Sequence, residues 1–334
     1  MQIRKHLDKF LVFLVLFILI CAIFKIFHLQ IVITYQSSAF ETYIDSDPKD
    51  LKDINLREIK FDADEEARRS YKLKSIRQKD LVFVGGFGRS GTTLMRIILD
   101  VHPNIRCGPE TKILPAFTGF LDQFFNRNRI VFDLAEAQLH NETLNNAAAL
   151  FIYHIMLSHG QNATRLCAKD PELLLNMRHL HQIFPNAKFI FMIRDGRAAS
   201  YSLMLKSRVV VTRKSFYAFL TSWNDMNVLI DEQCDQLSSA CLRVKYESLA
   251  IRPRETIHRV MRFLNESFIS EQLEHERHIG SRVVVSQLEW SSDQILRPIY
   301  TDSIDLWRKK APKLPIRRCR RRIPMLERFG YNLN

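Results

Sequence analysis

The chain has 334 residues, and its 49 lysine and arginine residues exceed its 36 aspartate and glutamate residues, for a formal net charge of +13. About 75 residues at the front look non-globular, so about 260 remain for folding, which suits one sizeable α/β domain rather than two. The positive charge favours acidic partners, such as nucleic acid, anionic lipid, a polyanionic substrate or a charged nucleotide, and charge alone does not choose among them.

An apolar segment lies close to the N-terminus. The run from Phe10 to Phe24 is unbroken, and Lys25, whose stem can lie along apolar surface, extends it to Phe27, about 18 residues. A secretory signal peptide is the alternative, but small residues should follow its apolar core, whereas residues 28–35 are bulky. We therefore expect a cytosolic tail at 1–9, a transmembrane signal anchor at 10–28, a luminal stem at 29–78 and a catalytic domain at 79–334.

Charges and modification motifs predict the orientation of this anchor. Arg4, Lys5 and Lys9 precede the apolar run and Lys25 alone lies at its other end, so the positive-inside rule places the catalytic domain in the lumen. The short span suits the thinner membranes of the early secretory pathway. Three N-x-[ST] sequons fit a luminal domain. Their asparagines are Asn141, Asn162 and Asn265.

A glycine-rich turn opens the catalytic domain. Four of the ten glycines of the chain lie between the apolar run at 81–84 and an apolar, helix-like continuation. Such a turn, with the helix N-terminus that follows it, predicts a cradle for an anion. The spacing from Gly86 matches a P-loop except that Thr92 replaces the lysine, and Arg89 supplies a cation instead, so a triphosphate with magnesium is not expected. The alternative is a turn that only links strand to helix.

Charged residues stand at the ends of further predicted elements. Residues 166–171 predict a short strand that ends in a polar turn, followed by an amphipathic helix through Phe184. Because ligands collect at the carboxyl ends of parallel strands, Lys169 and Arg89 are expected to face one crevice, although a solvated surface lysine is the alternative. Glu110 follows a turn between two cations, and it is alternatively an ordinary first-turn helix residue.

The clearest buried strand is 188–193, and the chain turns from it into a helix at Arg194. Arg194 and Ser202 predict a second phosphate-type site, so the ligand should carry two separated anionic groups, whereas Asp195 and Arg197 are interpreted as structural partners. Strand-helix alternation continues through a strand at 241–246 and a helix at 253–264, which predicts a parallel sheet covered on both faces.

A polar stretch, a basic run and a pair of cysteines complete the features of the predicted domain. The polar stretch 286–298 predicts a loop over the ligand. The basic run 317–322 is interpreted as a solvated face, or a contact with anionic lipid or glycan, rather than as part of the active site. Cys234 and Cys241 flank a short polar loop that a disulfide could close in an oxidising lumen, and spacing alone leaves the pairing of the other luminal cysteines open.

Taken together, these motifs resemble the protein-tyrosine sulfotransferases, from about Leu81 to Tyr331. The most specific matches are Arg89 to Arg96, His102-Pro103, Cys107-Gly108, Glu110-Thr111, Lys169 to Pro171, Phe184 to Phe189, Arg194 to Ala198 and Asp293-Gln294. The resemblance implies a P-loop-like sulfotransferase fold and a Golgi membrane protein of type II topology. It also implies transfer of a sulfuryl group from 3′-phosphoadenosine 5′-phosphosulfate to tyrosines in acidic segments of secretory-pathway proteins, without a metal.

The resemblance also assigns residues. Glu110 matches the general base, which must accept the proton of a phenol of pKa about 10, and Lys169, Ser286 and Arg89 would stabilise the charge that develops on oxygen. Lys112 and Thr111 are the expected substrate contacts. The implied disulfides are Cys107–Cys167 and Cys234–Cys241, so the resemblance assigns no disulfide partner to Cys319. The expected donor contacts are Arg89, Ser90, Gly91, Thr92, Thr93, Arg194, Ser202, Lys206, Tyr246, Ser286 and Arg297.

Several positions depart from the family pattern. Gly88 replaces a proline, Pro109 replaces the first of two glutamates, and Ala116 stands where an arginine for acidic substrates is expected. The segment before Asp293 is short, so the assignment of Ser286 depends on gap placement. Two alternative hypotheses are a membrane-anchored donor-binding homologue with weak or no turnover and a carbohydrate sulfotransferase. Nucleic acid is not an expected partner, and a homodimer is compatible with the resemblance.

Overall fold

The computed structural model describes residues 72–125, 134, 136–137, 139–158, 163–286, 292–314 and 316–332. All of them belong to the second of the two units into which the chain divides, 67–334. The expected cytosolic tail and anchor, most of the stem and the sequon asparagine Asn162 lie outside the described residues. Within the described ranges, no helix is long and apolar enough to cross a membrane.

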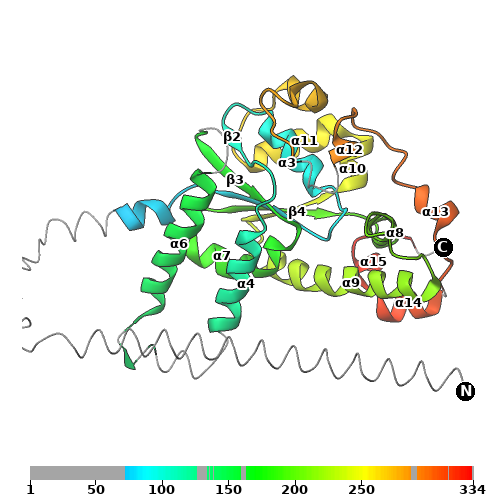
Figure 1. The fold of residues 1–334 in the computed structure, drawn as a ribbon, viewed down its shortest axis with the longest axis horizontal. Coiled ribbons are helices and arrows are strands. Elements are labelled where there is room, and N and C mark those ends of the chain that lie inside the picture. Colours follow the sequence, from blue (N-terminus) through cyan, green and yellow to red (C-terminus); the bar gives the residue numbers. More distant parts are fainter. Residues whose placement is uncertain are drawn as a thin grey trace, which may run out of the picture. The chain divides into compact units, whose positions relative to one another are not determined.

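Five parallel strands form one sheet in the order β2-β3-β1-β4-β5 (Figure 1). The strands are β1 (Val82–Gly85), β2 (Ile105–Arg106), β3 (Arg165–Lys169), β4 (Lys188–Ile193) and β5 (Cys241–Lys245). Strand β1 is central and buried along its whole length, as its continuous apolar sequence predicts for a parallel sheet with both faces covered. The expected parallel sheet with flanking helices is thus confirmed.

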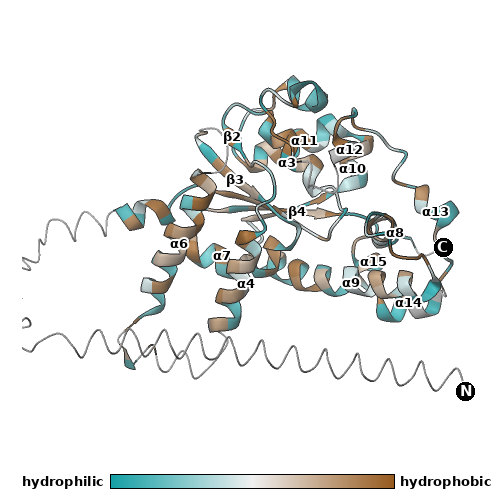
Figure 2. Ribbon diagram, viewed as in Figure 1, coloured by the Kyte–Doolittle hydropathy of each residue, from teal (hydrophilic) through white to brown (hydrophobic). Residues whose placement is uncertain are grey.

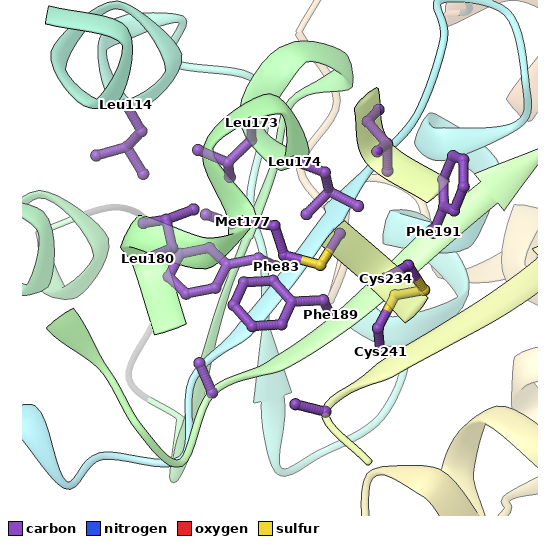
Figure 3. Close-up of a cluster of buried hydrophobic side chains, with 14 of the residues drawn as sticks. Phe83, Leu114, Leu173, Leu174, Met177, Leu180, Phe189, Phe191, Cys234 and Cys241 are labelled. Carbon is purple, nitrogen blue, oxygen red and sulfur yellow. A yellow bond between two sulfur atoms is a disulfide. The ribbon is translucent and has the colours of Figure 1, made fainter. Parts of the chain in front are cut away.

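The alternation of side chains along the strands divides the core into two layers. On one face, Phe83 and Phe189 stack with ring centroids 5.6 Å apart. Leu114, Leu173, Met177 and Leu180 belong to the apolar cluster around these rings (Figure 3). Helices α6, α9 (Arg213–Gln236) and α15 (Met325–Arg328) also contribute side chains to this cluster. On the other face, Val82 and Ile190 pack against α3, α10 and α11. The helices of this half are α3 (Thr92–Asp100), α4 (Ile113–Phe125), α6 (Asn141–Leu157), α7 (Met177–Ile183), α10 (Tyr246–Ile251), α11 (Pro253–Phe263) and the 3-10 helix η2 (Ser270–His278).

The remaining helices are α8 (Gly196–Lys206), α9 (Arg213–Gln236), α12 (Ser292–Ile295), α13 (Leu306–Lys310), α14 (Ile316–Arg322) and α15 (Met325–Arg328). Of these, α8 and α13 lie beyond the carboxyl end of β4, whereas α9 extends along the face of the sheet that carries Phe83 (Figure 1). Coloured by hydropathy, the strands are mostly apolar, while α13 carries a strongly hydrophilic surface (Figure 2).

Two local expectations need correction. The helix expected directly after Asp170 begins as a 3-10 helix, η1 (Pro171–Asn176), before α7. The reason is that the carbonyl of Pro171 accepts a hydrogen bond from the Gly86 N–H, 2.9 Å away, instead of closing an α-helical turn. The polar stretch 286–298 is also not wholly a loop, because it contains α12.

Both disulfides implied by the family resemblance are formed. Cys107–Cys167 joins the segment after β2 to β3, and Cys234–Cys241 joins α9 to β5. Helix α9 extends through Gln236, so the loop closed by the second disulfide is shorter than the sequence predicted. Cys319 is buried in α14, and neither disulfide includes it.

Candidate functional site

The turn between β1 and α3 has the backbone shape of an anion cradle. Gly86, Arg89 and Gly91 have φ angles of 139°, 71° and 91°. A Cβ atom on Gly86 would lie 2.2 Å from the Met192 carbonyl oxygen, and one on Gly91 would lie 2.7 Å from the Tyr246 ring. Only glycine fits these two positions. Gly91 is also the N-cap of α3 and offers no side-chain cap, so the first N–H groups of the helix are left to a ligand.

Two guanidinium groups meet beside this turn because β1 and β4 are neighbours. Arg194 follows β4, and its NH1 donates to the Arg89 carbonyl at 2.8 Å. The Arg194 guanidinium also lies over the Tyr246 ring, 4.5 Å from the centroid. Arg89 donates from Nε to Ser202 Oγ at 3.1 Å and from NH2 to Gln294 Oε1 at 2.6 Å. Burial, and then the charge of Arg194, lower the pKa of Arg89 below its ordinary value, and an anion bound here would raise that pKa again by favouring the charged guanidinium.

Unsatisfied polar atoms mark the same place. Ser90 Oγ and Arg194 Nε are buried and have no hydrogen-bond partner among the described residues. Buried polar groups are nearly always paired in proteins, so these atoms fit a polar ligand. Arg194 lines a cavity of about 790 Å³, which lies in the size range of small-molecule sites, and Ser90 stands between two of its lining residues, Arg89 and Gly91.

A buried ion pair adjoins the same cavity. The register of β1 and β3 pairs Val84 with Lys169, so Lys169 leaves the sheet beside the glycine turn. Its side chain is fully buried, donates from Nζ to Thr93 Oγ1 at 3.2 Å, and forms an ion pair with the Glu110 carboxylate. Glu110 lines the cavity. The Cys107–Cys167 disulfide ties the segment that carries Glu110 to β3 and thereby brings the two charges together.

Asp170 is a site residue that the sequence interpretation did not single out. It is buried, lines the cavity, and accepts from the Glu172 N–H through Oδ1, while Oδ2 has no partner among the described residues. Burial, with the charge of Glu110 as the second cause, raises its pKa to about 6. Its position directly after Lys169 at a strand end was the available signal.

The cavity brings together most of the residues predicted from the sequence. Those in its lining are Arg89, Gly91, Thr92, Thr93, Glu110, Lys112, Arg194, Tyr246 and Arg297. Ser90 and Ser202 lie next to it, and Lys169 reaches it through Thr93 and Glu110. Gln294, which also lines the cavity, lies in the stretch 286–298 that was expected over the ligand, although no role was assigned to it. Sequence reasoning missed Tyr300 and Ser303, which line the cavity too, because nothing local in their segment indicates contact with the glycine turn.

Besides Ser90, Lys169 and Ser202, three other predicted residues lie outside the lining of the cavity. Lys206 is exposed at the end of α8, Thr111 is exposed, and Ser286 is half-buried at the last position before the undescribed residues 287–291. Their proposed contacts stay predictions. Asp195 and Arg197 do pair with each other, through two hydrogen bonds of 2.9 and 2.7 Å, as expected of structural partners.

The sequons and the basic run lie on the surface. Asn141 is exposed at the start of α6, and Asn265 is exposed directly after α11. In the run 317–322, Arg317, Arg321 and Arg322 are exposed, in agreement with a solvated face.

Comparisons with known proteins agree with this geometry. The model of the sulfotransferase family matches residues 81–270. Protein-tyrosine sulfotransferase A of Caenorhabditis elegans is 36% identical over 79% of this chain and 72% of its own length, and protein-tyrosine sulfotransferase 1 of Danio rerio is 38% identical over 75% and 72%. The human protein-tyrosine sulfotransferase 1 is 35% identical over 75% of this chain and 70% of its own length.

Two solved structures share the fold. The sulfotransferase domain of the Synechococcus PCC 7002 olefin synthase has a TM-score of 0.54 at 23% identity and covers 77% of this chain and 97% of that domain. The sulfotransferase domain of the curacin biosynthetic pathway has a TM-score of 0.56 at 18% identity over 77% and 99%. At this identity the likeness establishes the architecture.

Proposed function

The chain belongs to the sulfotransferase family and, within it, to the protein-tyrosine sulfotransferases, and on that premise we propose that it transfers a sulfuryl group from 3′-phosphoadenosine 5′-phosphosulfate to tyrosine hydroxyls of secreted and membrane proteins. One observation carries the proposal: a carboxylate paired with a buried ammonium, Glu110 with Lys169, shares a cavity with the glycine cradle and its two guanidinium groups.

The residues present fit such a donor. The cradle at 89–93 suits a phosphosulfate, because Gly91 within it and Gly86 before it admit no side chain and Ser90 Oγ lacks a partner among the described residues. Arg194 and Ser202 would hold a second anionic group, the 3′-phosphate. Tyr246 and Tyr300, which both line the cavity, suit contacts with the nucleoside. When bound, the donor supplies the electrophilic sulfuryl group.

Glu110 would act on the acceptor. Its carboxylate lines the cavity and can take the proton of a phenol that enters there. Lys169 holds that carboxylate in place and, through Thr93, lies beside the first turn of α3, where its ammonium would stabilise negative charge on the transferred group. Arg89 would assist from the cradle. The acceptor tyrosines, in this proposal, lie in acidic sequence contexts.

The proposal also includes a membrane location and a homodimer. The apolar run at 10–27, the basic residues before it, the exposed sequons Asn141 and Asn265 and the two disulfides support a single-pass type II protein of the Golgi membrane with a luminal catalytic domain. Exposed apolar side chains on neighbouring helices, Ile113 and Phe120 on α4 and Leu150 on α6, support a homodimer.

A transfer assay tests the activity. The full chain in detergent is incubated with sulfur-labelled donor and a tyrosine peptide flanked by acidic residues, and we expect label on the tyrosine. Glu110→Gln should lower kcat by about 100-fold or more while donor affinity is retained. Glu172→Gln, which alters another carboxylate in the cavity lining, is the matched control and should keep most of the activity.

Two results would contradict this proposal. Label that goes to glycans and not to tyrosine would instead indicate a carbohydrate sulfotransferase. Donor binding by the folded protein, with no transfer to any tyrosine peptide, would indicate a homologue that binds the donor without turning it over.

A further inference from the structure

The positive charge of the chain is concentrated in two segments. Residues 196–224 and 306–322 hold 14 of the 49 basic residues and none of the 36 acidic ones, so the rest of the chain has 35 basic and 36 acidic residues. Nearly the whole net charge therefore comes from segments that are separated by more than eighty residues in the sequence.

The fold packs these segments together. Trp307 and Leu314 pack against Tyr201, Met204 and Phe216 of α8 and α9. The Arg197 guanidinium lies over the Trp307 ring, 4.4 Å from its centroid. Beyond α14, the Met325 N–H donates to Asn224 Oδ1 of α9 at 3.1 Å, so the chain from α13 to α15 follows α8 and α9.

We call the resulting surface the basic face and define it by nine exposed side chains. They are Arg208, Arg213, Lys214, Lys309, Lys310, Lys313, Arg317, Arg321 and Arg322. Among the described residues of this region, three ion pairs lie at the margin of the basic face. Arg197 pairs with Asp195, Arg308 with Asp305 and Arg320 with Glu327. So many uncompensated cations on one surface favour an anionic partner.

The basic face begins at the rim of the cavity. Ser207, which adjoins Arg208, lines the cavity, as does Ser303, which precedes α13. Both kinds of charge line the cavity, with Arg89, Lys112, Arg194 and Arg297 beside Glu110, Asp170 and Glu172. The three arginines are assigned to the donor, which leaves Lys112 as the lining cation for an acceptor, and Ala116 stands where a further cation is expected. The cavity thus offers few cations to the acidic part of an acceptor, whereas the basic face offers nine.

We propose that the basic face binds an acidic segment of the acceptor protein that is separated in sequence from the tyrosine to be modified. This inference rests on the proposed function. An acceptor held at both places gains affinity from the second contact, because that contact becomes intramolecular once the first has formed. The basic face would thus determine KM and the rate of encounter and leave kcat unchanged. A protein segment is favoured over glycan or lipid because the face is continuous with the cavity, so one chain can occupy both.

A binding experiment tests the basic face without relying on catalysis. The full chain in detergent is titrated into a fluorescent glutamate-rich peptide that has no tyrosine. Lys309→Gln/Lys310→Gln/Lys313→Gln removes three charges of the basic face and should weaken binding about tenfold at about 0.15 M salt. The matched control is Lys72→Gln/Lys74→Gln/Lys79→Gln, which removes three exposed charges from the first described segment and should change binding by less than about twofold.

Equal losses in the two triple variants, or no loss in the first, would overturn the proposal. The same titration is run with a heparin oligosaccharide and with phosphatidylserine vesicles. If the basic-face variant loses heparin or vesicle binding and keeps its affinity for the peptide, the face serves glycan or lipid and the proposal is wrong. Thermal melting of each variant verifies that it is folded.

An activity experiment links the face to the acceptor. Two tyrosine peptides are compared, one with an acidic run set apart from the tyrosine and one with neutral residues there. In the basic-face variant, KM for the first peptide should rise about tenfold with kcat unchanged, and the second peptide should be unaffected. A fall in kcat for both peptides would contradict the inference. Absence of transfer by the unaltered protein would refute the proposed function alone, because the binding titration still tests the face.

Discussion

Replacing Asp100 with asparagine should destabilise the protein severely. Arg96 and Asp100 are one turn apart on α3, their side chains are 0% and 1% exposed, and Arg96 NH1 lies 3.2 Å from Asp100 Oδ2. Asp100 Oδ1 also accepts from the Cys107 N–H at 2.6 Å. Arg96 NH1 donates to the Val284 carbonyl at 2.7 Å. The pair therefore joins α3 both to the segment that leads to Glu110 and to the segment that leads to Ser286.

The magnitude follows from the burial of the pair. Removing one partner of a buried ion pair leaves the other charge uncompensated and costs about 3 to 5 kcal/mol of unfolding free energy. For a domain of this size each kcal/mol corresponds to about 2 to 4 °C, so Tm should fall by about 6 to 20 °C. The control is Glu255→Gln. It breaks the Arg252–Glu255 pair, whose side chains are 64% and 73% exposed, and should cost less than about 0.5 kcal/mol.

Thermal unfolding of the full chain, followed by circular dichroism at one scan rate for all variants, measures the difference. Asp100→Asn should also lower kcat/KM, because the N–H of Cys107 loses its charged acceptor and the segment that positions Glu110 loosens. A Tm for Asp100→Asn that equals the Tm of Glu255→Gln would refute the reasoning, because burial would then not change how much an ion pair contributes to the free energy of unfolding.

Two further predictions concern the cavity. The pKa of Asp170, raised from 3.8 to about 6, means that the folded protein binds more protons than the unfolded chain between these values. Stability should therefore fall, on the order of 3 kcal/mol, as pH rises through that window. Asp170→Asn should flatten this dependence, which urea midpoints at several pH values would reveal, and an unchanged slope would contradict the assigned pKa. In the glycine turn, a Cβ on Gly88 would meet only Leu203 at 3.8 Å, whereas one on Gly91 would strike the Tyr246 ring at a φ of 91°. Gly88→Ala should therefore keep Tm and donor affinity, and Gly91→Ala should lose about 1 to 3 kcal/mol of stability and most donor binding. Calorimetry with the donor checks both variants, and equal behaviour would refute the steric argument.

The sequence alone determined the features that depend on neighbouring residues. The runs at 81–84 and 188–193 became β1 and β4 because an unbroken apolar run suits a strand buried on both faces. The glycine spacing predicted the cradle because the positive φ angles belong to consecutive residues of one turn. The family resemblance supplied the pairing of Cys107 with Cys167, which spacing had left open.

Only the tertiary structure decided which distant residues share the cavity. Glu110 meets Lys169 across 59 residues because β2 pairs with β3 and the Cys107–Cys167 disulfide joins the segment after β2 to β3. Arg89 meets Gln294 across 205 residues because α12 packs against α3. The burial of Asp170 and the convergence of two basic segments on one surface have the same origin. Periodicity and turn chemistry describe the chain over a few residues, whereas contacts between distant segments follow from how the helices and strands pack together.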